Sequence, residues 1–367
     1  MVALAAPGDR VRVRLDRVKG NVCFASIVEV IEASPVRIEP PCPYFGRCGG
    51  CDFQQLTYEA QLSAKIEIVK DCLHRIGRLD NYPELQITAA PHQWRYRSRA
   101  QWQYDSVRKQ IGYFESGSRR ICDVAECAVL VPELQHTLAA VRQQMDEGLL
   151  PAEVKYFRAV AGDCGVALTP GIKSAAAGPD RLNNISRAVR DEKYLLNAES
   201  FFQTNLDLLP QLIEGSIGKS RGVTAVELYC GVGLFTLPLA RRFRKVVAVE
   251  ESSDAVRFAQ MNLANAGLTN TEIVNSDVGL WLQRQVAAEE LDLVLLDPPR
   301  IGAESRVIDG ILQLRPKQIC YVSCDPATLA RDLRKIIAGG FVLDSLAAFD
   351  MFPQTHHVET VANLVGP

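Results

Sequence analysis

Cys324 lies between an apolar run and an Asp-Pro pair in the stretch YVSCDPATLARDL. Asp325 is a favourable N-cap and Pro326 a favourable first helical residue, so Cys324 is predicted to lie just before a helix. The positive end of that helix favours a thiolate, whereas the neighbouring Asp325 carboxylate disfavours it. The local pattern therefore fits a nucleophilic cysteine and a buried, inert cysteine equally well.

Glu359 is a second candidate for chemistry, in the C-terminal stretch HHVETVANL. His356 and His357 are close to it in sequence, and the residues around it are mostly apolar, as in a strand. A carboxyl group in such a setting can have a raised pKa and act as a general base. The competing interpretation is an exposed strand residue with no part in chemistry.

A Gly-x-Gly turn, Gly231 and Gly233, joins a predicted strand to a predicted helix in ELYCGVGLFTLPLA. Such a turn lets a ligand approach the backbone closely. Glu250 ends the next predicted strand, where a carboxylate can bind ribose hydroxyls. A dinucleotide site would have a third glycine where this chain has Thr236, so the turn alone does not identify the cofactor.

Two further acids follow predicted strands in the same half of the chain. Asp277 follows TEIVNS, where a carboxylate can reach an adenine amino group, and Asp297 follows LDLVLL. The carboxyl ends of parallel strands meet at one edge of a sheet, so these acids and Glu250 are expected to lie together. Each acid alone could be a solvated strand end or a helix cap. Together with the Gly turn, they resemble the site of the class I S-adenosylmethionine methyltransferases.

Three cysteines, Cys42, Cys48 and Cys51, fall within CPYFGRCGGC, in a chain of 367 residues with 11 cysteines. An odd number of cysteines and no secretory signal argue against a disulfide framework, so the cluster is predicted to bind metal. A fourth ligand could be Cys122 or Cys127 in RICDVAECAVL. The spacing alone allows zinc as well as an iron–sulfur centre.

Charge and hydropathy narrow the class of protein. Lys and Arg number 41 and Asp and Glu 43, so no uniform basic field covers the molecule. With no signal peptide and no apolar run of about 18 residues, we expect a cytoplasmic protein without a membrane span.

A nucleic-acid site in this chain needs local clustering of basic residues. Strand alternation in RYRSRAQW would put Arg95, Arg97 and Arg99 on one face. The alternative is an ordinary exposed sheet face.

Hydrophobic periodicity divides the chain into three expected domains. Residues 1–41 are predicted to form a small β segment, and residues 42–192 a β-rich central domain that includes the cysteine cluster. Helices are predicted near residues 58–76 and 132–145. From 193 to 367 strands alternate with helices, which predicts a parallel sheet covered on both faces. The expected fold class is therefore α/β and Rossmann-like, with β-rich elements before it.

Six motifs closely resemble those of the RNA 5-methyluridine (uracil-5) methyltransferases: CPYFGRCGGC, FFQTN, ELYCGVG, LDPPR, YVSCDPATLARDL and HHVETVANL. The resemblance runs from about residue 11 to residue 364. It implies methyl transfer from S-adenosylmethionine to carbon 5 of a uridine in RNA. It also implies a central domain that binds RNA and an iron–sulfur cluster. Ahead of that domain the family has an OB-like (TRAM-type) segment, of which we expect only the latter part here, either because the true start lies upstream or because this is a shortened form.

Cysteines at this spacing hold a 4Fe–4S cluster within that family. Cys42, Cys48 and Cys51 match the first three ligands. The family pattern places the fourth ligand before a short Val-Leu stretch, which selects Cys127. A four-cysteine zinc site is the rival interpretation. Either centre would connect the small N-terminal segment to the central domain.

The resemblance also implies roles at the reaction site. Cys324 matches the nucleophile that adds to carbon 6 of uracil, and Glu359 matches the base that removes the proton from carbon 5. Tyr229 matches a cofactor contact, as do Glu250 and Asp297.

Residues expected to meet the RNA come from two further motifs. Gln203 matches a residue that contacts both the cofactor and the target base, and Phe201 is expected to stack on a flipped uracil. Arg300 is expected to meet a phosphate or the base. Together with the arginine-rich stretch, these residues imply RNA as the partner.

The nature of the RNA is open at this stage. The resemblance favours 23S ribosomal RNA, because the full cysteine set is commoner among the ribosomal enzymes, and it leaves the T-loop of tRNA as the alternative. We expect a monomer. Two other classes compete: a small-molecule methyltransferase, which needs no cluster, and a non-catalytic RNA-binding protein. The latter predicts loss of Cys324 or Glu359, which this chain retains.

Overall fold

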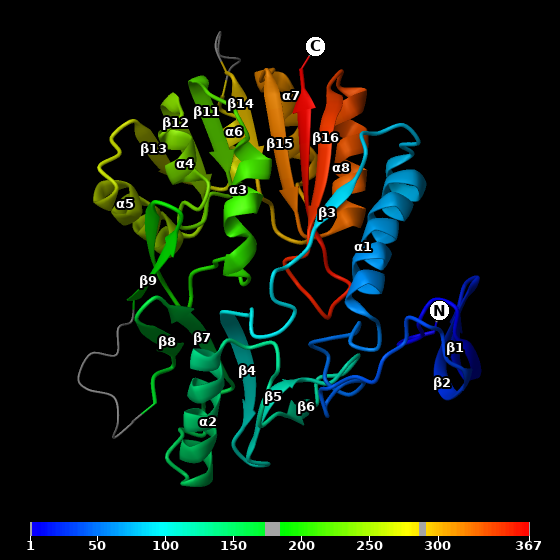
Figure 1. Ribbon diagram of the computed structural model, residues 1–367. Coiled ribbons are helices and arrows are strands. Elements are labelled where there is room, and N and C mark those ends of the chain that lie inside the picture. The colour runs from blue at the N-terminus through cyan, green and yellow to red at the C-terminus, as the bar shows by residue number, and fades with distance from the viewer. Residues whose placement is uncertain (1, 173–183, 286–290, 367) are drawn as a thin grey trace.

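The computed structural model describes residues 2–172, 184–285 and 291–366. Within these ranges the largest element is an eight-stranded sheet, seen in the upper half of Figure 1. Its strands are, in spatial order, β13 (Thr271–Asn275), β12 (Phe243–Glu250), β11 (Gly222–Leu228), β14 (Leu293–Leu296), β15 (Gln318–Ser323), β17 (Glu359–Val365), β16 (Val342–Phe349) and β3 (Gln86–Thr88). The strands from β13 to β15 are parallel, and β17 runs antiparallel to β15 and β16. This topology confirms the predicted α/β fold.

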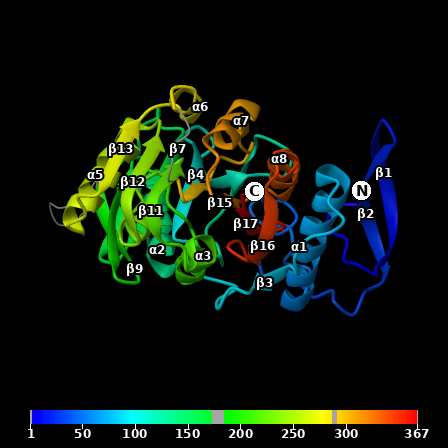
Figure 2. The same cartoon turned by 90° about the horizontal axis from the view of Figure 1, so that it is seen from above.

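Helices cover both faces of this sheet, as Figure 2 shows for α3 on one side and α6, α7 and α8 on the other. One face carries α3 (Leu209–Ile217), α4 (Thr236–Ala240) and α5 (Ser253–Asn265). The other carries α6 (Val278–Leu282), α7 (Ser305–Leu314), α8 (Pro326–Ala338) and α1 (Tyr58–Cys72). Strand β14, LVLL, is wholly buried between these layers, as expected of a central parallel strand.

The central domain is built on a second, antiparallel sheet below the first (Figure 1). Its strands are β6 (Ile121–Asp123), β5 (Gln110–Phe114), β4 (Arg99–Asp105), β7 (Tyr156–Gly162) and β8 (Gly165–Thr169). Trp102 of β4 and Phe157 of β7 pair across the sheet, and both are fully buried under α2 (Pro132–Asp146). This arrangement confirms a β-rich middle region and its helix.

Two elements ahead of the central sheet pack on the large sheet instead. Strand β3 pairs with β16, and α1 contacts α8. The predicted helix over residues 58–76 is thus present as α1 followed by a π-helical turn, Leu73–Gly77.

The predicted domain boundary after residue 192 falls within a hairpin of two strands, β9 (Asn184–Val189) and β10 (Glu192–Asn197). Packing therefore does not follow the division drawn from the sequence.

The N-terminal segment forms one long hairpin, β1 (Arg10–Lys19) and β2 (Val22–Glu32), whose residues are mostly exposed. The β segment predicted from the sequence is therefore a single hairpin of two long strands, and the OB-like origin of the segment stays a prediction. In the part of the chain that the structure describes, no helix has the length and hydropathy needed to cross a membrane.

Candidate active site

Strand pairing brings Cys324 and Glu359 together. Ser323, the last residue of β15, pairs with Thr360 of antiparallel β17, whose hydroxyl donates a 3.0 Å hydrogen bond to the Ser323 carbonyl. Cys324 directly follows Ser323, and Glu359 directly precedes Thr360, so the two residues lie at neighbouring ends of the paired strands. The charge of Glu359 acts on the Cys324 thiol, as expected of groups close in space. The thiol and the carboxyl therefore lie near one another at the carboxyl edge of the large sheet.

Burial controls the protonation of this pair. Glu359 is 1% exposed, and its Oε1 has no hydrogen-bond partner among the described residues. Burial raises the pKa of Glu359 well above its ordinary value, Asp297 raises it further, and Arg300 opposes them. Burial also raises the pKa of the Cys324 thiol to about 12, with a contribution from Glu359. The sequence left the direction of this pKa shift open, and burial is its largest cause.

Asp325 caps α8 as the sequence predicts. Its Oδ1 accepts 2.9 Å hydrogen bonds from the backbone N–H groups of Ala327 and Thr328, and Pro326 is the first residue of the helix. The cap is satisfied within the chain, so it holds the backbone next to Cys324 in one conformation.

The Gly-x-Gly turn follows β11 in a left-handed backbone conformation. Gly231 and Gly233 have φ values of 55° and 97°, and Tyr229 before them has a φ of 65°. Glu250, at the end of β12, accepts a 3.0 Å hydrogen bond from the Gly231 N–H. A Cβ on Gly231 would meet no protein atom, so backbone conformation rather than crowding requires glycine there. The turn is open to a ligand beside the Glu250 carboxylate.

The two further acids lie at the same edge of the sheet. Asp277 caps α6, accepting a 2.7 Å hydrogen bond from the Leu280 N–H, and lies 3.3 Å from the Arg306 guanidinium. Burial raises the pKa of Asp297, and a hydrogen bond from the buried Gln203 opposes the rise. Strand order reverses between β11 and β14, the place where open α/β sheets bind ligands. The structure thus brings together the acids that the sequence singled out.

Glu227 is a residue beside this site that the sequence analysis missed. It is 1% exposed within β11 and accepts a 2.5 Å hydrogen bond from the hydroxyl of Thr236, the first residue of α4. Burial raises the pKa of Glu227 to about 8. The bond spans the Gly turn and fixes its two ends. The available signal was a single acid inside the apolar strand TAVEL.

Two expected substrate contacts lie at the surface. The Phe201 side chain is 64% exposed, and Arg300 is exposed while its charge acts on both Cys324 and Glu359. An exposed ring can stack on a base, and a cation at the edge of the site can meet a phosphate.

The prediction that Arg95, Arg97 and Arg99 share one strand face is wrong. Strand β4 begins only at Arg99, and Arg95 has a left-handed backbone with a φ of 54°. Arg99 donates hydrogen bonds to the carbonyl oxygens of Ser200 and Ala198, and Arg97 lines the cysteine pocket. Alternation requires extended backbone throughout, which is interrupted at Arg95. Of the three, only Arg95 is exposed, and its contact with RNA stays a prediction.

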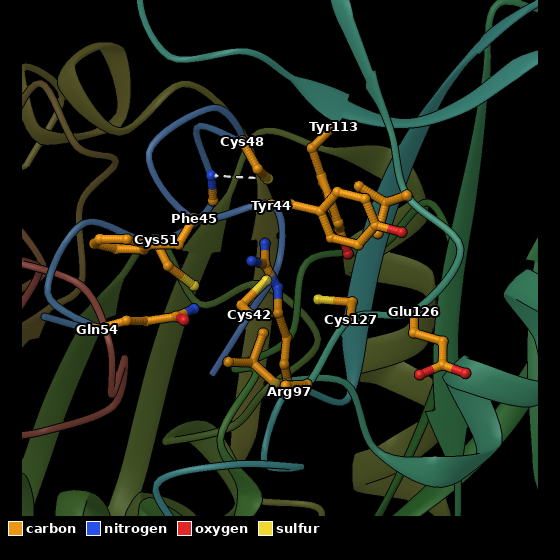
Figure 3. A pocket seen from close by; sticks show the side chains of 14 residues that line it. Cys42, Tyr44, Phe45, Cys48, Cys51, Gln54, Arg97, Tyr113, Glu126 and Cys127 are labelled. Atoms are coloured by element: carbon orange, nitrogen blue, oxygen red, sulfur yellow. Dashed lines mark hydrogen bonds between the residues drawn. The ribbon is translucent and has the colours of Figure 1, made fainter. Parts of the chain in front are cut away.

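Four cysteines from two distant segments line one pocket. Figure 3 shows Cys42, Cys48, Cys51 and Cys127 around a common space, with the Arg97 side chain among them. Burial raises the pKa of Cys48 to about 11 and that of Cys51 to about 12. The positive charge of Arg97 opposes the rise in the pKa of Cys51. The pocket therefore collects soft ligand atoms around a buried cation.

Cys127, rather than Cys122, is the fourth cysteine of this pocket. Cys122 is 1% exposed and accepts a 3.3 Å hydrogen bond from Nε of Arg47. Among the described residues, no three side chains of the metal-binding type converge closely enough to hold a metal ion. The four thiols share a pocket without forming an assembled coordination site.

The parallel sheet, the Gly turn after β11 and the acids at the carboxyl edge define the fold and site of a class I S-adenosylmethionine-dependent methyltransferase. A family model described as tRNA (Uracil-5-)-methyltransferase matches residues 181–365. An RNA methyltransferase of Thermosynechococcus vestitus is 33% identical, over 99% of this chain and 92% of its own. One of Halalkalibacterium halodurans is 30% identical, over 98% and 90%. The chain belongs to the RNA uracil-5-methyltransferase family and is an S-adenosylmethionine-dependent RNA methyltransferase.

A solved structure supports the same conclusion over the whole chain. The tRNA (uracil-54, C5)-methyltransferase of Pyrococcus abyssi, in complex with S-adenosyl-L-homocysteine, matches with a TM-score of 0.79 and 25% identity. The match covers 99% of this chain and 95% of that one. The predicted family, enzyme class and α/β fold are thereby confirmed.

Proposed function

We propose that this enzyme methylates carbon 5 of a specific uridine in RNA through a covalent bond between Cys324 and carbon 6 of the uracil. The observation that carries the proposal is the β15–β17 pairing, which brings the Cys324 thiol near a buried carboxyl, that of Glu359, whose Oε1 has no hydrogen-bond partner among the described residues. Cys324 is only partly buried, so a base that leaves the RNA stack can reach it. S-adenosylmethionine, when bound, supplies the methyl group as an electrophile.

Carbon 5 of uracil is a weak nucleophile and must be activated before it can accept a methyl group. Cys324 and Glu359 together can provide this activation. The Cys324 thiolate forms a bond to carbon 6, and the electrons of the 5,6 double bond move toward carbon 5 and oxygen 4. Carbon 5 can then form its bond to the methyl group while the bond from that methyl to the cofactor sulfur would break, which would leave S-adenosylhomocysteine. Glu359 takes the remaining proton from carbon 5, the C–H electrons restore the double bond, and the carbon–sulfur bond breaks to return the thiolate.

The raised pKa of Glu359 in the free protein suits the second half of the reaction, in which a base removes the proton from carbon 5. A carboxyl group with a raised pKa is a stronger base once it is ionised. The positive charge of Arg300 lowers the pKa of Glu359, and a bound cation would add to that effect. Glu359 is therefore expected to act as the base only in the loaded site.

We assign cofactor binding to the carboxyl edge of the large sheet. Gly231 and Gly233 would let the cofactor approach the backbone, and Glu250 would accept hydrogen bonds from its ribose. Asp277 would receive the adenine amino group. Asp297 and Gln203, which are hydrogen-bonded to one another, would meet the reacting end, and Tyr229 the ring system.

For the cysteine pocket we propose a 4Fe–4S cluster held by Cys42, Cys48, Cys51 and Cys127. Thiolates are the ligands of such clusters, and all four thiols line one space. A four-cysteine zinc site is the second candidate, because zinc also binds four thiolates. The resemblance of the cysteine spacing to that of the family favours the cluster.

For the target we propose 23S ribosomal RNA, on the strength of the complete cysteine set. The tRNA T-loop is a second candidate. The similarity to the Pyrococcus abyssi enzyme, whose substrate is uracil-54 of tRNA, favours that candidate. The exposed Phe201 and Arg300 serve either target, since both require a flipped base and a phosphate contact.

The experiment that tests the proposal is trapping on RNA that contains 5-fluorouracil. Fluorine at carbon 5 cannot leave as a proton, so the reaction stops with Cys324 attached to the base. Anaerobically purified enzyme, S-adenosylmethionine and total fluorinated RNA should give an adduct on a denaturing gel that Cys324→Ala lacks. Sequencing the trapped RNA then identifies the target. Absence of an adduct, with cofactor bound, would overturn the proposal and favour a binding protein or a small-molecule enzyme.

A further inference from the structure

The loop of residues 350–357 leads into Glu359 and is held by segments far from it in sequence. Asp52 and Phe53, which directly follow Cys51, donate backbone hydrogen bonds of 3.1 and 3.0 Å to the carbonyl oxygen of Gln354. Cys51 itself lines the cysteine pocket. A single short peptide therefore connects that pocket to the loop before the catalytic carboxyl.

Helix α1 holds the same residue of the loop from the other side. Gln61 donates a 3.1 Å hydrogen bond to the side-chain oxygen of Gln354 and accepts a 2.9 Å hydrogen bond from its backbone N–H. Gln61 is 1% exposed and Gln354 is 2% exposed. Gln354 has a left-handed φ of 70°, an unfavourable conformation for glutamine that its surroundings must maintain.

Contacts of the same kind continue along the loop. The Asp52 carboxylate accepts a 2.8 Å hydrogen bond from the His356 N–H and also bonds to the His356 ring. Lys65 of α1 pairs with Asp350 in a fully buried ion pair and donates a 3.0 Å hydrogen bond to the Phe352 carbonyl. Both ends of the loop are thus fixed by α1 and by the residues after Cys51.

Glu359 depends on this support more than an ordinary side chain does. Its Oε1 has no hydrogen-bond partner among the described residues, so no side-chain contact fixes that oxygen. Its position follows from the backbone of Glu359, the first residue of β17, which pairs with Phe349 of β16 and follows the loop after one intervening residue, Val358. A shift of the loop would therefore move the carboxyl relative to Cys324.

We propose that Asp52 and Gln61 are positioning residues for the general base, Glu359. We further propose that occupancy of the cysteine pocket fixes the peptide of Asp52 and Phe53 against the loop of residues 350–357. This inference rests on the proposed function of Cys324 and Glu359. When Cys51 is a ligand, its backbone is fixed at the metal centre, and the N–H groups of Asp52 and Phe53 are aimed at the loop. When the pocket is empty, that constraint is lost, and the proton transfer from carbon 5 slows.

The test separates the two halves of the reaction. Gln61→Leu removes both hydrogen bonds to Gln354 at nearly constant volume, and Glu59→Gln on the exposed side of the same helix is the matched control. On RNA with ordinary uracil, Gln61→Leu should form the covalent adduct at the normal rate. Elimination should slow roughly 10- to 100-fold, as a displaced catalytic group predicts. Adduct should therefore accumulate on denaturing gels, as it should in Glu359→Gln.

A second measurement does not depend on activity. Hydrogen exchange of the peptide covering residues 350–358 should be faster in Asp52→Asn, and faster in the wild type after iron has been removed. The inference would be overturned if elimination kept its normal rate in both Gln61→Leu and Asp52→Asn. It would also be overturned if hydrogen exchange of residues 350–358 were the same with and without iron. If Gln61→Leu fails to fold, Asp52→Asn decides the question. A wild-type enzyme that forms no adduct with fluorinated RNA would instead refute the proposed function, so the two failures can be told apart.

Discussion

Cys324 directly follows the last residue of β15, Glu359 is the first residue of the neighbouring antiparallel strand β17, and the Glu359 carboxyl contributes to the raised pKa of the Cys324 thiol. Two negative charges at this spacing repel one another, so the free site retains protons. A cation bound beside Asp297 would act in the opposite direction, because Asp297 itself raises the pKa of both groups. The pair is thus arranged so that cofactor binding can activate it.

Cofactor charge should therefore control the reactivity of Cys324. With its pKa near 12, the free thiol should react slowly with iodoacetamide at neutral pH. S-adenosylmethionine, whose sulfonium is positive, should accelerate alkylation by about tenfold for each unit by which the pKa falls. Mass spectrometry can follow Cys324 alone, with Cys72 as an internal control. Equal acceleration by the uncharged S-adenosylhomocysteine would contradict the electrostatic explanation.

Substitutions of the two proposed catalytic residues should block the reaction at different steps. Cys324→Ala should abolish both adduct and product, because no other group can add to carbon 6. Glu359→Gln should lower turnover by about 10²- to 10⁴-fold, the usual contribution of a general base, while adduct accumulates. Single-turnover assays with labelled methyl donor measure both quantities. An adduct-free Glu359→Gln variant that still folds and binds cofactor would refute this assignment.

Glu227 should make stability depend on pH. Its pKa rises from 4.5 to about 8 on folding, so the folded protein retains a proton that the unfolded chain releases in this interval. Stability contributed by the protonated group is present below 4.5 and is lost as the pH rises through about 8. Glu227→Gln mimics the protonated form and should flatten this decline in urea unfolding experiments. Glu272→Gln, at an exposed position, should leave the decline unchanged.

The cysteine pocket predicts a difference between two neighbouring cysteines. Cys127→Ser should lose iron and visible absorbance after anaerobic purification, because Cys127 lines the pocket. Cys122→Ser should retain both, since Cys122 bonds to Arg47 instead. Iron and sulfide analysis of the two variants checks this directly. Loss of iron in Cys122→Ser with full retention in Cys127→Ser would show that Cys122 is the fourth ligand. Zinc instead of iron in the wild-type protein would show that the site binds zinc and not a cluster.

Removal of iron should change more than the pocket. The cluster would join residues 42–51 to the loop that carries Cys127, closing a long stretch of chain. Cluster-free protein should therefore unfold at lower temperature, with the loss largest in the central domain. Thermal unfolding monitored with and without an iron chelator, under anaerobic conditions, measures the effect. Identical unfolding curves would show that the centre contributes little to stability.

Sequence patterns predicted the local features of this protein because those features depend on neighbouring residues. The cap at Asp325, the Gly turn and the helix over residues 132–145 each follow from residues within one or two turns of chain. The parallel sheet followed from the alternation of strands and helices. The acids at its edge followed as well, since each one ends or follows a strand.

The failures have a common physical cause. The arginine-rich stretch alternates like a strand, yet tertiary contacts hold Arg99 against the carbonyls of Ser200 and Ala198. Arg97 lies within the cysteine pocket for the same reason. Periodicity describes the preference of a segment by itself, and partners distant in sequence can override it.

The sequence by itself singled out the residues proposed to carry the chemistry: a cysteine before a capped helix, an acid in an apolar strand and a cysteine cluster. Tertiary structure alone decided that Cys324 lies near Glu359, because the β15–β17 register is set by pairing between distant segments. It also decided the protonation of both groups, since burial comes from side chains of the whole fold. Long-range packing depends on many weak contacts summed over the molecule, and no local pattern records that sum.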